Sequence, residues 1–173
     1  AILYCLVIFT SWFKIDLKCS WRIRWKDIGL VVLVLGALMV AILIPASAIG
    51  FVKAAVWDVA EKNPWLPLVL LPLFFVTPAL GEELIYRGVI QNLLSKRINI
   101  LVAILIQAII FGFAHINNSA GGSRFPNWPY VIFATIAGAG YGFVYWRSGN
   151  LAVSALLHAS VDLTWKVFWK GDR

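Results

Sequence analysis

Six runs of apolar residues dominate this chain of 173 residues and limit the folds open to it. They occupy residues 1–13, 28–52, 65–94, 98–116, 129–146 and 151–169. A helix that crosses a bilayer needs about 20 such residues, so the first run is interpreted as part of a helix and the others as whole ones. In lipid only helices and closed barrels satisfy the backbone, and strand-length segments that alternate inward and outward are absent. The sequence therefore predicts an all-α, multi-pass transmembrane helical bundle.

The composition indicates that lipid surrounds much of the surface of this protein. Hydrophobic residues make up 61% of the chain and charged residues 13%, against about half and about a quarter in soluble domains. The net charge of +7 could indicate a nucleic-acid-binding protein. The basic residues, however, are spread over the short connections between apolar runs, which is typical of juxtamembrane charge and not of a phosphate-binding face. We expect the lipid bilayer as a partner and no nucleic acid.

The charged connections also predict an orientation. If each run crosses the membrane once, residues 14–26, 95–97 and 147–150 lie on one side. The basic residues on that side are Lys14, Lys18, Arg22, Arg24, Lys26, Lys96, Arg97 and Arg147. The opposite side carries fewer. The first side should therefore be cytoplasmic, because short cytoplasmic loops are enriched in lysine and arginine.

The run at residues 65–94 looks too long for one straight crossing and is interrupted by Pro67, Pro72 and Pro78. A new helix can begin there, with Thr77 as the N-cap and Pro78 at the first helical position. A proline kink in one long helix is an equal alternative. Further along, Gly138 and Gly142 lie four residues apart, a spacing that lets membrane helices pack closely.

Six ionisable residues lie well inside the apolar runs: Glu82, Glu83, Arg87, His115, His158 and Asp162. Both histidines of the chain belong to this set. Ionisable groups inside a membrane are energetically costly and by default indicate a functional site.

Helical geometry divides the first three of these residues. Glu83 and Arg87 are four residues apart, so they share a face and can form a supporting ion pair. Glu82 lies about 140° from Arg87 around the helix axis and therefore projects toward a different partner. A carboxylate without a local cation is suited to act as a general base. A purely structural ion network is equally compatible with residues 82–87 alone.

The other ionisable residues form two further groups. His115 follows Phe111 by four residues, and Asp162 follows His158 by four, so each pair shares a helix face. An aspartate one turn away can hold the orientation and tautomer of a histidine. A lone histidine in a helix is more often a satisfied core group. Two histidines and an unpaired glutamate on three separate apolar helices favour a functional site instead.

Signatures of other hydrolase classes are missing from the sequence. It contains neither an HExxH zinc-protease helix nor a GxSxG elbow, and no second well-buried aspartate accompanies Asp162. Ser154 lies one turn before His158, but no acid that would orient the base is evident on that helix. We therefore do not favour a serine mechanism.

The three motifs together resemble a known family. Glu82-Glu83-x-x-x-Arg87, Phe111-x-x-x-His115 and His158-x-x-x-Asp162 follow one another on successive apolar helices. In this they resemble the CAAX protease and bacteriocin-processing family, also called CPBP or Abi, which includes the Ras-converting CAAX endopeptidases. The motifs cover about residues 77–165. The resemblance implies an intramembrane endopeptidase, an integral multi-pass protein of a prokaryotic plasma membrane or its equivalent.

The resemblance also implies roles for the residues, in a polar cavity among the last four helices. Glu82 would activate a water as general base and His115 would help to place that water. His158 and Asp162 would stabilise the oxyanion. Because an ionised aspartate cannot donate to an oxyanion, Asp162 would either be protonated or orient His158, and we favour the second. The eukaryotic CAAX proteases typically carry asparagine at this position.

A metal is the open question of this prediction. Glu82, His115 and His158 could compose a zinc site with one open position. We expect no cofactor, because no tight ligand motif such as HExxH is present, and zinc is the alternative. The expected partner is a peptide or protein substrate at or in the membrane.

Two other functions could use the same residues. A non-proteolytic membrane immunity or scaffold protein of this fold would keep the polar cluster for structure. An ion or proton carrier would use the buried charges for transport.

We treat residues 1–173 as a single membrane domain. Residues 1–76 would contribute the partial first helix, a basic interfacial segment and a peripheral helix, and residues 77–165 the motif core. Straight helices would place His115 about 25 Å from the start of its run and His158 about 12 Å from the start of its own. The two histidines can meet only if one helix is tilted or begins outside the bilayer.

Overall fold

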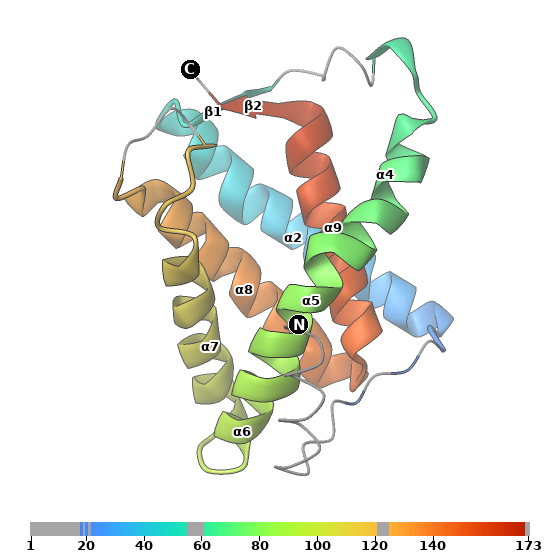
Figure 1. The fold of residues 1–173 in the computed structure, drawn as a ribbon, viewed down its shortest axis with the longest axis vertical. Helices are drawn as coiled ribbons and strands as arrows, with labels where there is room; N and C mark the ends of the chain where they lie inside the picture. The colour runs from blue at the N-terminus through green and yellow to red at the C-terminus, as the bar shows by residue number, and fades with distance from the viewer. Residues whose placement is uncertain (1–17, 19, 21, 55–60, 121–124, 172–173) are drawn as a thin grey trace.

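The computed structural model describes residues 18, 20, 22–54, 61–120 and 125–171. Its helices are α2 (Trp25–Ala48), α4 (Leu66–Phe74), η1 (Phe75–Ala79), α5 (Leu80–Glu83), η2 (Leu84–Gln91), α6 (Asn92–Ser95), α7 (Ile100–Ala114), α8 (Trp128–Ser148) and α9 (Leu151–Phe168) (Figure 1). Two short strands, β1 (Val52–Ala54) and β2 (Trp169–Gly171), pair antiparallel and tie the end of α2 to the end of α9. The predicted all-α class is confirmed. The partial helix expected at residues 1–13 lies outside the described residues.

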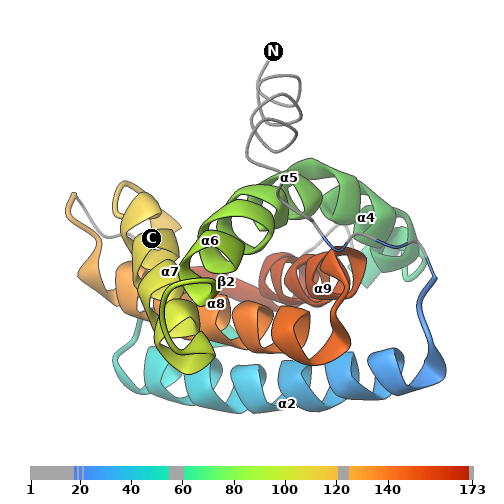
Figure 2. The same ribbon diagram turned by 90° about the horizontal axis from the view of Figure 1, so that it is seen from below.

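The helices pack as a bundle in which α8 and α9 are central. Helix α2 lies along one side against both of them, as Figure 2 shows, while α7 packs on α8. The segment from α4 to α5 packs on α9, and η2 and α6 continue from it toward α7. Three helical segments are long and apolar enough to cross a membrane: Trp25–Ala48, Leu66–Ser95 and Leu151–Phe168. Helix α2 exposes large side chains such as Val32, Leu33 and Ile44, which suits contact with lipid.

The segment from α4 to α6 is broken at Thr77, where the backbone leaves the helical region with φ −141° and ψ 113°. The Thr77 hydroxyl does not cap the following helix, because it donates backward to the Leu73 carbonyl at 3.1 Å. The second half begins at Pro78 and therefore carries Glu82 and Glu83 within its first two turns. It widens into the π-helical segment η2, a distortion found frequently at functional sites.

Glycines bring α7 and the π-helical segment close to α8. A Cβ at Gly112 of α7 would overlap the Thr135 side chain and lie 2.7 Å from the Val131 carbonyl oxygen. On α8, a Cβ at Gly142 would lie 2.5 Å from the Gln107 amide nitrogen and 2.7 Å from Gln91 Oε1. The predicted small-residue packing face is therefore present on α8, and both α7 and η2 pack against it.

The basic segment before α2 is held at one end of the bundle. The Leu151 amide donates to the Lys18 carbonyl at 2.9 Å, and the Ser20 amide donates to Asn150 Oδ1 at 3.1 Å. Arg24 reaches the Ser148 carbonyl at 3.3 Å. The described part of this segment thus lies beside the turn between α8 and α9, on the side that the crossing pattern of the sequence predicted.

We predict that Gly112→Ala destabilises the protein by about 1–3 kcal/mol, because the added methyl group must push α7 away from α8. Gly36→Ala on α2 is the matched control, since nothing lies within 4 Å of the place its Cβ would take. Thermal unfolding in detergent should show a lower midpoint for the first variant alone. Equal midpoints would contradict the close approach of α7 and α8.

Candidate active site

The two adjacent glutamates have different environments. Glu83 is fully buried and accepts a hydrogen bond from Arg87 Nη1 at 2.8 Å. The Glu82 side chain is 31% exposed and faces a cavity. The pairing of Glu83 with Arg87 that the spacing predicted is therefore present, and Glu82 projects away from it.

Arg87 is enclosed on every side. Its side chain is fully buried, and Nη2 donates to the Gly138 carbonyl of α8 at 2.9 Å. The guanidinium carbon lies 4.8 Å from the centre of the Phe111 ring and 5.1 Å from that of Tyr141. Such ring faces attract a cation. Arg87 thereby joins three elements: its own segment, α7 and α8.

His158 is oriented by Glu83. Its Nδ1 lies 2.9 Å from Glu83 Oε1, and because an ionised carboxylate only accepts, Nδ1 must carry the proton and donate. The ring also stacks on Tyr141, with centroids 4.4 Å apart and planes 19° apart. The carboxylate at Nδ1 is thus that of Glu83 and not that of Asp162, the acid that the spacing indicated. Asp162 Oδ2 lies 3.6 Å from the opposite ring nitrogen, Nε2, since one further turn of α9 carries the aspartate to the cavity side.

His115 is oriented by its own helix. It follows the last residue of α7, and its Nδ1 donates to the Phe111 carbonyl at 2.8 Å. Its ring stacks against Tyr130 of α8 at 5.8 Å between centroids. A carbonyl can only accept, so this bond fixes the tautomer with the hydrogen on Nδ1. In both histidines Nε2 is thus left to face the cavity.

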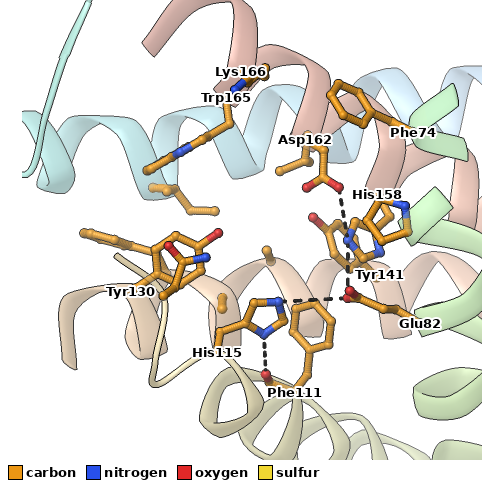
Figure 3. Close-up of a pocket in the computed structure, with 17 residues that line it drawn as sticks. Phe74, Glu82, Phe111, His115, Tyr130, Tyr141, His158, Asp162, Trp165 and Lys166 are labelled. Atoms are coloured by element: carbon orange, nitrogen blue, oxygen red, sulfur yellow. Dashed lines mark hydrogen bonds and ion pairs between the residues drawn. The ribbon is translucent and has the colours of Figure 1, made fainter. Parts of the chain in front are cut away.

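Glu82 meets these two nitrogens at one place. Its Oε2 lies 3.9 Å from His115 Nε2 and 3.9 Å from His158 Nε2, as Figure 3 shows. Among the described residues this oxygen accepts no hydrogen bond. Polar atoms at this separation are commonly bridged by a water. The α6–α7 connection lies lower than the α8–α9 connection in Figure 1, so the end of α7 reaches the height of the middle of α9. There the Phe111 and His158 rings have centroids 5.7 Å apart, so the two histidines do not differ in depth as straight helices from one face would require.

The cavity beside these groups has a volume of about 340 Å³ and is mostly apolar away from them. Phe74, Phe133, Ala134, Val161 and Trp165 are among its lining residues. It lies among the predicted four helices, and Ile42 adds a wall residue from α2. Because Tyr130 at the start of α8 and Lys166 at the end of α9 also line it, the cavity extends toward the β1–β2 end, away from the basic segment.

The donor set matches a zinc site only loosely. Tetrahedral zinc with ligands at about 2.1 Å would bring neighbouring donors to about 3.4 Å. The separations from Glu82 are wider, and no group of three His, Cys, Asp or Glu in the described part of the chain is arranged to hold a metal ion.

Ser154 does not face the cavity. Its buried hydroxyl lies 2.6 Å from Glu83 Oε2 and 2.9 Å from the Tyr141 carbonyl. A nucleophilic role is therefore excluded by geometry, because no substrate carbonyl in the cavity can reach this oxygen.

One family model, described as type II CAAX prenyl endopeptidase Rce1-like, matches residues 64–164. The chain belongs to this family. No curated protein and no solved structure matches the chain. The family assignment confirms the predicted membership in the CAAX proteases, and with its three long apolar helices the chain is a multi-pass membrane protein.

Within this Rce1-like domain, the contact between Glu83 and His158 was missed by the sequence analysis. The two residues are 75 positions apart, and the i, i+4 rule offered Asp162 as the nearer acid. A weak signal was available. Ser154 and His158 lie one turn apart on α9, so packing of the Glu83 helix on that face of α9 would give Glu83 two polar partners besides Arg87.

We predict that Arg87→Met destabilises this CAAX protease domain by about 3–5 kcal/mol, because it leaves the buried Glu83 carboxylate without its cation. Arg97→Met is the matched control, since Arg97 is exposed on the α6–α7 connection. Unfolding of both variants in detergent would be followed by tryptophan fluorescence. An Arg87 variant as stable as the Arg97 variant would show that the ion pair is not structural.

Proposed function

We propose that this chain is an intramembrane endopeptidase that hydrolyses peptide bonds of membrane-associated substrates with a water activated by Glu82. The observation that carries the proposal is the convergence of Glu82 Oε2 with Nε2 of His115 and of His158 at one end of the cavity. Family membership supports a peptidase, and the protein substrate follows from it.

In the proposed reaction a water lies between Glu82 and His115 Nε2. Glu82 removes one proton from this water, and the oxygen attacks the carbonyl carbon of the scissile bond. A general base in a site of this kind accelerates the reaction by about 10²–10⁴. The proton held by Glu82 then passes to the leaving nitrogen, and the carbon–nitrogen bond breaks. An amine and a carboxylic acid are released, and the acid then loses its remaining proton to the solvent.

His158 is the proposed donor to the oxyanion. Its Nδ1 hydrogen is already given to Glu83, so it can donate into the cavity only when Nε2 also carries a proton. Two carboxylates flank the ring, Glu83 at Nδ1 and Asp162 at 3.6 Å from Nε2. In this proposal Asp162 is the negative group beside the donating nitrogen.

The apolar wall suits the rest of the substrate. A cavity lined by Phe74, Phe133 and Val161 would remove an apolar side chain from lipid or water without leaving polar groups unpaired. Ala134 and Ala137 leave room on the α8 side. We therefore expect cleavage next to a bulky apolar residue of a segment at or in the membrane.

We predict that Glu82→Gln lowers kcat by at least about 100-fold, because an amide cannot take a proton from water. The unfolding midpoint should not change, since the Glu82 side chain is 31% exposed and its Oε2 accepts no hydrogen bond among the described residues. Fluorogenic apolar peptides in proteoliposomes would report the cleavage rate by fluorescence, and mass spectrometry would identify the bond that is cleaved. Glu61→Gln is the matched control, because Glu61 is exposed. Cleavage by the Glu82 variant at the wild-type rate would overturn the proposed function.

We propose that the reaction proceeds without a metal, and a second experiment tests this step alone. Purified protein should contain far less than one zinc per chain by elemental analysis, and a chelator should leave peptide cleavage unchanged. The reason is the wide spacing of the three donors relative to zinc coordination. One zinc per chain, with cleavage lost on its removal and restored by its return, would replace the glutamate mechanism by a metal-assisted one.

A further inference from the structure

Ser154 lies beneath the site without touching the cavity, and its contacts are those of a residue that acts through another. It is fully buried on α9, one turn before His158. The 2.6 Å between its Oγ and Glu83 Oε2 is the distance of a hydroxyl donating to a charged carboxylate. The hydroxyl has one hydrogen, so the longer contact with the Tyr141 carbonyl, at 2.9 Å, is the weaker of the two.

The two carboxylate oxygens of Glu83 accept hydrogen bonds from different residues. Oε1 accepts from both Arg87 Nη1 and His158 Nδ1. Oε2 has Ser154 as its hydrogen-bond donor. Arg87 and His158 both hold Oε1, and a rotation of the carboxylate about its last carbon–carbon bond would carry this oxygen away from both of them. Ser154 restrains that rotation from the other oxygen.

The orientation of the carboxylate matters because it determines where the His158 ring points. The ring is held by Glu83 at Nδ1 and by Tyr141 on one face, and this places Nε2 3.9 Å from Glu82 Oε2. A rotation of the carboxylate would move the acceptor of Nδ1 and release the ring about its own side-chain bonds. Nε2 of His158 would then no longer be held toward Glu82 Oε2.

We propose that Ser154 is a positioning residue that, through Glu83, fixes the His158 ring for catalysis. It would contact neither substrate nor water. The inference rests on the proposed function for its consequence in cleavage, and on geometry alone for the orientation of the ring. Outer-shell partners of metal-bound histidines change activity by about 10–100-fold when removed, and we expect an effect of that order for the partner of this histidine.

Ser154→Ala should lower kcat by about tenfold and leave KM nearly unchanged. Ser160→Ala is the matched control on the same helix, because the Ser160 hydroxyl donates to the Leu156 carbonyl of α9 and Ser160 is not among the residues that line the cavity. The abundance and unfolding midpoint of both variants would be measured first.

The deciding readout is nuclear magnetic resonance of protein labelled with ¹⁵N in histidine only. The chain has two histidines, so the spectrum reports only His115 and His158. In Ser154→Ala the Nδ1-bound proton of His158 should move upfield, as its bond to the carboxylate loosens, while the His115 signals stay in place. Ser160→Ala should move neither.

The outcomes separate this inference from the proposed function. A His158 signal unchanged in Ser154→Ala would overturn the positioning role, whatever the rate of cleavage. A shifted His158 signal in a protein that cleaves no peptide would support the positioning role and contradict the proposed function. A shifted signal with an unchanged kcat would overturn the catalytic consequence of the positioning.

Discussion

The ion pair between Glu83 and Arg87 is the interaction on which the rest of the site depends. Both side chains are fully buried in a membrane protein, where an unpaired charge would be strongly unfavourable. The pair is stabilised because each member has further polar partners: the Gly138 carbonyl for Arg87, and Ser154 and His158 for Glu83. These partners lie on α8 and α9, so the pair also holds three helical segments in one arrangement.

The same pair explains why two neighbouring glutamates can do different things. Every acceptor oxygen of Glu83 is occupied, so this residue is available neither to a water nor to a substrate. Glu82 is one position further back, points into the cavity and has no donor among the described residues for its Oε2. In the π-helical segment that follows, Arg87 and Gln91 both face α8. Their hydrogen bonds to the Gly138 and Gly142 carbonyls hold this segment on α8.

Local spacing predicted the parts of this arrangement that belong to single helices. The six ionisable residues stand out because they lie inside apolar runs. The Glu83–Arg87 pair and the packing face of Gly138 and Gly142 follow from rules for residues four positions apart. The break at Thr77 was one of two alternatives that the sequence left open. The orientation of His158 could not be derived in this way, because the carboxylate that accepts from its Nδ1 belongs to Glu83, 75 positions away in the sequence. Spacing offered Asp162, which lies on the other side of the ring.

The family match and the geometry support the proposed chemistry from different directions. The match covers residues 64–164 and says nothing about which atoms meet. The geometry brings one free carboxylate oxygen and two histidine nitrogens to one place, and it accounts for the tautomer of each ring by a bond to an acceptor. A mostly apolar cavity of about 340 Å³ adjoins that place.

The most direct test is an experimental structure of the protein in a membrane mimetic, at a resolution that shows ordered water. The account predicts one density peak about 2.7–3.2 Å from Glu82 Oε2 and from at least one of the two histidine Nε2 atoms. A Glu82 side chain turned away from both histidines would contradict the account. So would a peak about 2.0–2.2 Å from all three atoms, which is the distance of a bound metal.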